Sequence, residues 1–241
     1  LDGSTRITAI WDQTEQSGTP PEGFSYGSEY SGEMINAALQ TEDPRSLVPS
    51  VDESGHGTYA ASIASGGADA GEQFLGAAPE ASIAMVKLKQ AKDYLRDYYF
   101  IPRDAVCYQE TDLMLGLKYL NDLADRLRLP LVICITVGTS MGGHIGTLPF
   151  PFLIEGYSTR ANRITVIGTG NEADKRHHFY DALESSTDSR TVELRVGENV
   201  SGFSLELWSD IPNVFSISMI SPSGESTSRI PFRAGAGAEI D

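Results

Sequence analysis

The sequence has few basic side chains and no long apolar run. Of its 241 residues, 18 are lysine or arginine and 33 are aspartate or glutamate, which gives a formal net charge of −15. A chain of this charge is repelled by phosphate backbones and anionic membrane surfaces, so we expect no nucleic-acid partner and no membrane partner. A membrane-spanning helix needs about 18 consecutive apolar residues, which this sequence lacks. The stretch LDGSTRITAIWD at residues 1–12 has no signal-peptide pattern, and the localisation stays open.

Cysteine is also scarce. The chain has two cysteines, Cys107 and Cys134, which is too few for a disulfide framework. They indicate neither a reducing nor an oxidising compartment. Cys134 lies within the apolar run LVICITV and is predicted to be a buried small hydrophobic residue, with a disulfide to Cys107 left open. The acids at 52–55 and 69–72 and the histidines at 177–178 lack the spaced partners of a metal site, so we expect no metal and no cofactor.

Apolar strand-like runs alternate with helical patterns along most of the chain. Strands are predicted at 6–12, 81–88, 131–138 and 164–172, and helices at 31–39, 55–67, 110–127 and 152–161. This order predicts an α/β fold, with a parallel sheet covered by helices on both faces. From about residue 188 the pattern changes to short alternating segments separated by turn residues, at 191–196, 202–208, 213–220 and 228–232. We therefore expect two units, an α/β domain at 1–187 and part of an antiparallel β-rich module at 188–241.

Three polar residues stand where parallel sheets carry their active sites, at strand ends and helix starts. Asp12 ends the first predicted strand, His56 opens a helix between two glycines, and Asn171 follows the run VIGTG. Each has a plain interpretation on its own, as a turn acid, a surface histidine and a turn asparagine. A helix N-terminus disfavours the imidazolium form, however, so His56 is suited to act as a base. The amide of Asn171 is suited to donate to a developing oxyanion.

Together, four blocks resemble the subtilisin-like serine proteases. The string ITAIWD is similar to their aspartate strand, GHGTYAASIASG to their histidine block, GAAPEASIAMVKL to the strand that follows, and ITVIGTGNE to their oxyanion-asparagine strand. The blocks occur in the family's order over about residues 5–182. The resemblance implies a subtilisin-like fold and hydrolysis of peptide bonds through an acyl-enzyme. One departure is WDQT, where many relatives have DSG or DTG.

The resemblance also implies roles for individual residues. Asp12 would orient His56, His56 would move the proton between the serine and the leaving amine, and Asn171 would hold the oxyanion. The substrate would be a polypeptide bound as an extended strand, and a propeptide would be a further partner. The substrate-binding residues implied are Thr136, Val137 and Gly138 along the peptide, and Gly168, Thr169 and Gly170 as a wall of the primary specificity pocket.

The stretch GTSMGG at 138–143 is similar to the family's nucleophile block by its letters alone. Ser140 precedes Asn171, whereas the family's nucleophile follows the asparagine and begins a long helix of small residues. The glycines and prolines of MGGHIGTLPFPF cannot open such a helix. The later stretch SPSGESTS at 221–228 has no following helical pattern. We therefore predict that Ser140 is not the nucleophile, that this chain ends before the serine block, and that the 241-residue chain alone is inactive.

The segment 188–241 resembles the first half of a jelly-roll-type insertion found in the spore-germination subtilases of spore-forming bacteria. Two alternatives stay open. One is a catalytically inactive subtilisin-like protein that binds a peptide or a partner protease. The other is a nucleotide-binding α/β domain, which the strings GTGNE and GTSMGG disfavour because they match no phosphate-loop spacing and no lysine follows them.

Overall fold

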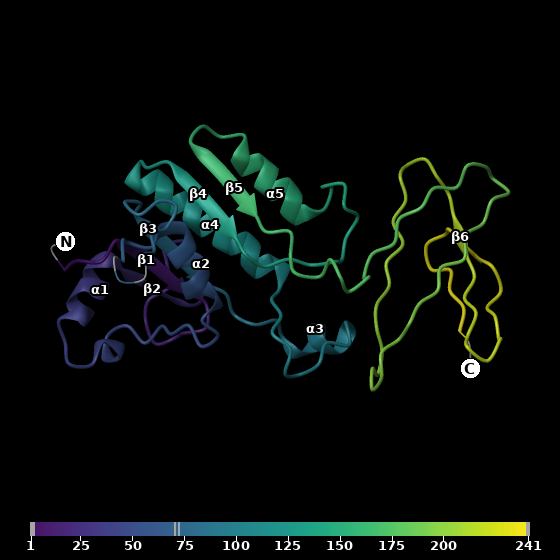
Figure 1. Cartoon of the computed structure of the whole chain (residues 1–241), viewed down its shortest axis with the longest axis horizontal. Helices are drawn as coiled ribbons and strands as arrows, with labels where there is room; N and C mark the ends of the chain where they lie inside the picture. Colours follow the sequence, from purple (N-terminus) through teal and green to yellow (C-terminus); the bar gives the residue numbers. More distant parts are fainter. Residues whose placement is uncertain (1–2, 70, 72, 240–241) are drawn as a thin grey trace.

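The structure is a computed structural model that describes residues 3–69, 71 and 73–239. Figure 1 shows an elongated molecule in which mixed α/β structure occupies the N-terminal part. Along the chain the elements are β1 (Ile7–Asp12), β2 (Ser28–Ser31), α1 (Gly32–Leu39), the short 3-10 helix η1 (Pro44–Ser46), α2 (His56–Ser65), β3 (Ile83–Lys87), α3 (Asp93–Tyr98), α4 (Glu110–Leu127), β4 (Leu131–Ile135), α5 (Pro149–Ser158), β5 (Arg163–Ile167), β6 (Ser216–Ile217) and β7 (Ile230–Pro231).

The first sheet has the strand order β2-β1-β3. Strand β1 runs parallel to β3, with Asp12 opposite Lys87 at their ends, and antiparallel to the short strand β2. Trp11 is fully buried, with ring centroids 4.6 Å from Phe24 and 5.3 Å from Tyr119. This aromatic packing anchors the end of β1, so the position of Asp12 is determined by the hydrophobic core beside it.

The second sheet consists of β4 and β5, which pair in parallel with Ile135 opposite Ile167. Helix α4 contacts both β3 and β4 and thereby joins the two sheets, while α5 packs against α4 and β5 (Figure 1). Helix α4 spans the residues predicted for it, and its buried side includes Leu117, Tyr119 and Leu123. The parallel α/β fold predicted from the sequence is confirmed.

The other face of this second sheet is apolar and exposed. The register pairs Val132 with Ile164 and Cys134 with Val166, so these four side chains share one face. All four are exposed, Val132 by 65%. We call these four residues the bare sheet face. The prediction that Cys134 is buried is wrong for the described chain, because α4 and α5 lie on the opposite side. Cys107 and Cys134 are both free thiols.

The C-terminal segment forms less regular structure than its pattern predicts. Among the described residues there, β6 and β7 pair as a short antiparallel ladder and an isolated bridge pairs Ile220 with Ser226. The strands predicted at 191–196 and 202–208 are wrong, because an alternating pattern needs a neighbouring strand to satisfy its backbone groups and none pairs with them here. The segment lies at the end of the molecule opposite the N-terminus (Figure 1). It contacts the α/β part where Glu206 Oε2 accepts a 2.8 Å hydrogen bond from the backbone N–H of Gly142.

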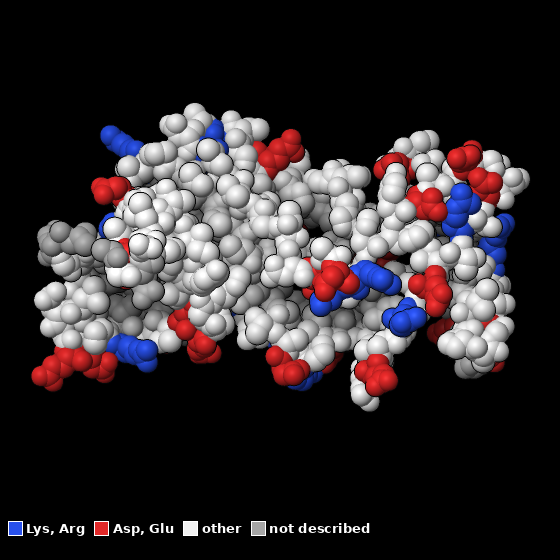
Figure 2. All heavy atoms as spheres, in the orientation of Figure 1, with Lys and Arg blue, Asp and Glu red and all other residues white. Residues whose placement is uncertain are grey.

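The surface shows no continuous basic area in the view of Figure 2, where acidic and basic side chains occur in small separate groups. Among the described residues, no helix combines the length and the apolar character needed to cross a membrane.

Candidate active site

The ends of the parallel strands bring the predicted substrate-binding segments together. Strands β4 and β5 end side by side at Ile135 and Ile167, and the backbone N–H of Gly168 donates to the carbonyl oxygen of Ile135 at 3.0 Å. Residues 136–138 and 168–170 therefore leave one edge of one sheet as neighbours. An added Cβ at Gly138 would meet no atom within 4 Å, so this backbone is open to an incoming chain.

His56 is the first residue of α2, and an acid four residues earlier determines where that helix begins. Asp52 accepts hydrogen bonds from the backbone N–H groups of Gly55 at 2.9 Å and Thr58 at 2.8 Å, and from the Thr58 hydroxyl at 2.8 Å. These bonds, led by the Thr58 backbone bond, lower the pKa of Asp52 to about 2. An ionised Asp52 thus caps the helix and places the His56 imidazole at its exposed start.

The imidazole of His56 contacts the end of β4. Its Nε2 atom lies 3.1 Å from the Thr136 hydroxyl and 3.2 Å from the Thr136 carbonyl oxygen. The carbonyl oxygen can only accept, whereas the hydroxyl can donate or accept, so this contact fits either tautomer of a neutral ring. The structure therefore places the predicted base directly beside the first residue of the predicted peptide-binding segment.

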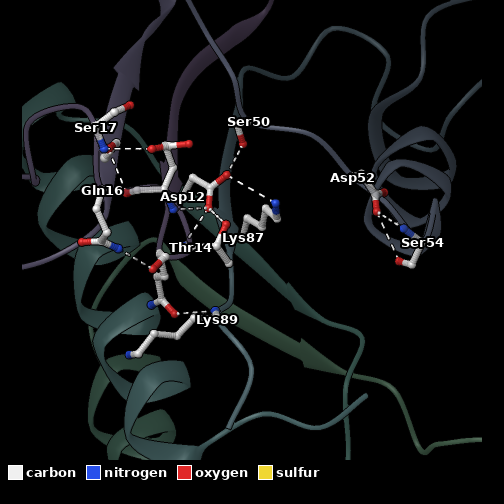
Figure 3. A network of polar contacts seen from close by, with 12 residues as sticks. Asp12, Thr14, Gln16, Ser17, Ser50, Asp52, Ser54, Lys87 and Lys89 are labelled. Atoms are coloured by element: carbon white, nitrogen blue, oxygen red, sulfur yellow. Dashed lines mark hydrogen bonds and ion pairs between the residues drawn. The ribbon is translucent and has the colours of Figure 1, made fainter. Parts of the chain in front are cut away.

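Asp12 is buried and does not contact His56. Its Oδ1 atom accepts from the Thr14 hydroxyl at 2.6 Å and the Thr14 backbone N–H at 2.8 Å. Its Oδ2 atom accepts from the Ser50 hydroxyl at 2.6 Å and pairs with Lys87 Nζ at 3.5 Å. Figure 3 shows this network, with Asp52 and Ser54 standing apart from it. The expected Asp12–His56 hydrogen bond is not formed between these two described residues, and the carboxylate oxygens bond to Thr14, Ser50 and Lys87.

Asn171 follows β5 in an exposed bend, as predicted, and no hydrogen bond joins its side chain to another described residue. The adjacent Glu172 accepts from His177 Nδ1 at 2.7 Å and from the Ser140 hydroxyl at 3.5 Å. The Ser140 hydroxyl thus points to Glu172, and no helix begins between Ser140 and Pro149. That Ser140 is not the nucleophile stays a prediction.

Sequence reasoning missed three residues around Asp12, namely Thr14, Ser50 and Lys87. The pairing of β1 with β3 places Lys87 opposite Asp12, and only the folded chain brings Ser50 to the carboxylate. No group of three or more histidine, cysteine, aspartate or glutamate side chains suited to a metal occurs among the described residues, which leave out Ala70 and Glu72 of the acidic stretch 69–72.

Comparison with known proteins indicates the family to which this chain belongs. The subtilase family pattern, Peptidase S8, matches residues 28–193, which include His56 and Asn171 and begin after Asp12. Among solved structures, the chain is similar to one described as the structure of the Clostridium perfringens CspB protease, with 29% identity and a TM-score of 0.74. That match covers 96% of this chain and 45% of the other, so this chain spans less than half the length of that protease. No curated protein matches. Because the family pattern covers most of the sequence, this chain belongs to the subtilase family of serine peptidases.

Proposed function

We propose that this chain carries the aspartate, histidine and asparagine of a serine endopeptidase site, and that residues outside these 241 supply the nucleophilic serine. The observation that carries the proposal is the position of His56. Its imidazole is exposed at a helix start, beside Thr136 at the edge where the open backbone of residues 136–138 begins.

The substrate is a polypeptide laid along residues 136–138 as an added strand. His56 Nε2 accepts the proton of the serine hydroxyl as the serine oxygen attacks the peptide carbonyl carbon. Asn171 donates to the resulting oxyanion. The imidazolium then passes that proton to the amine as the C–N bond breaks, and water releases the acyl group in a second step by the same route. For this, His56 must leave Thr136 and present an unprotonated Nε2, with its other ring nitrogen protonated and turned toward Asp12.

The bare sheet face supports the placement of the serine outside this chain. Val132, Cys134, Ile164 and Val166 are apolar side chains in contact with solvent on a sheet whose other side is packed. Burial of such an apolar surface stabilises a protein by about 25 cal/mol for each Å² removed from water. We propose that the segment carrying the serine covers this face and so brings its N-terminal end to His56.

We further propose that the chain belongs to the spore-germination branch of the family and divides into units at 1–187 and 188–241. The structural similarity to a Clostridium protease supports the first statement. The second is supported by the change in the described structure, which has no helix after α5 and only the short strands β6 and β7 after residue 188.

The experiment is labelling of the full-length protein with a fluorophosphonate probe, followed by mass spectrometry of the labelled peptide. We expect a single labelled serine outside residues 1–241, lost in the variant His56→Ala, and no labelling of the 241-residue chain alone. Stoichiometric labelling of Ser140 would overturn the assignment. The variant Ser140→Ala serves as the matched control and keeps the label.

A second candidate function is peptide or partner-protease binding without catalysis. It is favoured by the donors on both oxygens of Asp12 and by the contact of His56 Nε2 with Thr136, which together leave the acid and the base engaged elsewhere. Binding of a peptide by a full-length protein that never reacts with the fluorophosphonate would support this candidate instead.

A further inference from the structure

The carboxylate of Asp12 is held on both oxygens by donors from three parts of the chain. The side chain is buried, with 1% of the residue exposed. Thr14 donates twice to Oδ1, through its hydroxyl and its backbone N–H, and the backbone N–H of Glu15 adds a 3.3 Å contact. Ser50 donates to Oδ2 at 2.6 Å, and Lys87 lies 3.5 Å from the same atom (Figure 3). These contacts leave the carboxylate little freedom to rotate.

The turn that presents Thr14 is itself fixed by its neighbour Gln13. The Gln13 side chain is fully buried and donates through Nε2 to the carbonyl oxygen of Asp112 at 3.0 Å. Its Oε1 atom accepts from the backbone N–H of Lys89 at 3.3 Å, and its own backbone N–H donates to the carbonyl oxygen of Lys87 at 2.9 Å. Gln13 therefore ties the end of β1 to the start of α4 and to the end of β3. Gln13 and Thr14 stand where many relatives have the last two residues of DSG or DTG. Gln13 holds the end of β1 in place, and Thr14 bonds to Asp12.

Ser50 approaches Asp12 from a different direction. It lies 38 residues from Asp12 in the sequence, in the connection that leads to Asp52 and then to His56. Its bond to Oδ2 ties that connection to the end of β1. The acid and the segment that carries the base are thereby held to each other through Ser50, although Asp12 and His56 do not touch.

We propose that Thr14 and Ser50 are positioning residues for Asp12, with Thr14 orienting Oδ1 and Ser50 tethering the His56-bearing segment to Oδ2. The inference rests on the proposed function in taking Asp12 as the acid of the triad. It assigns to a threonine and a distant serine the task of keeping this buried carboxylate ionised and oriented.

The pKa of Asp12 agrees with that assignment. Burial alone raises the pKa of a carboxyl group, because it disfavours the charged form. Here the bonds from Ser50 and Thr14, together with the charge of Lys87, outweigh burial and hold the pKa of Asp12 below its ordinary value. Asp52 offers an internal comparison, since Ser54, Gly55 and Thr58 hold it in a similar way on an exposed surface.

The test uses the full-length protein and the variants Thr14→Val, Thr14→Ser and Ser50→Ala. Valine keeps the shape of threonine without the hydroxyl, and serine keeps the hydroxyl, so Thr14→Ser is the matched control. The pKa of the Asp12 carboxyl is measured by carbon NMR over a pH series, with Asp52 as internal reference. We expect the pKa of Asp12 to rise in Thr14→Val and Ser50→Ala and to stay low in Thr14→Ser. The pKa of Asp52 is expected to stay unchanged in all three variants.

The second measurement is kcat/KM at neutral pH. A hydrogen bond to a charged group contributes about 1.5–3 kcal/mol, so its loss lowers kcat/KM about tenfold or more. A fall in thermal stability with an unmoved Asp12 pKa and an unchanged kcat/KM would show a merely structural role and overturn the inference. The variant Asp12→Asn tests the proposed function separately. If it keeps full activity while Thr14→Val and Ser50→Ala still raise the pKa of Asp12, the proposed function fails, whereas the positioning of the carboxylate stands.

Discussion

His56 Nε2 lies 3.1 Å from the hydroxyl of Thr136, a residue 80 positions later in the chain. This contact joins the start of α2 to the end of β4, and it places the candidate base at the first residue of the segment 136–138. In the proposed function, a peptide paired with that segment passes within reach of His56. The contact thus joins the proposed base to the proposed peptide-binding segment.

Gly138→Ala tests this segment. An added Cβ at Gly138 meets no protein atom within 4 Å, so we expect the thermal midpoint of the full-length protein to stay unchanged. The methyl group enters the space of the paired peptide, so we expect KM for a peptide substrate to rise about tenfold, equivalent to about 1.4 kcal/mol of binding. Gly156→Ala is the control, because Gly156 lies in α5 and its added Cβ also meets nothing within 4 Å. An unchanged KM in Gly138→Ala would place the peptide elsewhere.

A pair of glycines tests how the core holds Asp12. Gly27 has φ +76° and an added Cβ would lie 2.4 Å from Trp11 Nε1 and 2.7 Å from the Asp12 carbonyl oxygen, whereas Gly23 has φ +82° with nothing within 4 Å. Gly23→Ala carries only the strain of the left-handed conformation, about 1–2 kcal/mol. Gly27→Ala adds overpacking of about 1–3 kcal/mol. We expect thermal unfolding to show the lower midpoint for Gly27→Ala, and equal midpoints would contradict the packing around Trp11.

Asp52 predicts a pH dependence of stability. Its pKa in the folded chain is about 2, below the ordinary value of 3.8, so folding favours the ionised form. Such a group stabilises the fold fully above its unfolded pKa, and its contribution is lost as the pH falls through the folded pKa. We expect Asp52→Asn to lower the thermal midpoint at pH 6, with the difference from the unmodified protein shrinking between about pH 4 and pH 2. A difference that stays constant over that range would contradict the cap.

Cys134 reports on the bare sheet face. In the 241-residue chain its thiol is exposed, so a thiol reagent is expected to modify it rapidly under native conditions. If a further segment covers the bare sheet face in the full-length protein, we expect the reagent to modify Cys134 at least about tenfold more slowly. The thiol would then react only when the packed surface opens. Cys107 is half-buried and serves as the reference thiol in both chains. Equal reactivity of Cys134 in the two chains would show that the face stays uncovered.

Elements that depend on neighbouring residues were predicted correctly from the amino-acid sequence. Helix α4 begins and ends where its leucine spacing predicts, and α1 begins after Ser31, whose hydroxyl accepts from the backbone N–H of Met34 at 3.3 Å. The blocks around His56 and Asn171 also pointed to the family that the comparison shows. Periodicity and capping act over a few residues, so they can be recognised in the sequence alone.

Contacts between residues far apart in the chain became visible in the folded protein. It brought Ser50 and Lys87 to Asp12, turned His56 toward Thr136, left Cys134 exposed, and left residues 191–196 and 202–208 without a paired strand. Burial, strand pairing and the partners of a carboxylate depend on residues far away in the chain, which no local pattern contains. An apolar run shows that a strand can be covered, and the arrangement of the other elements decides whether it is.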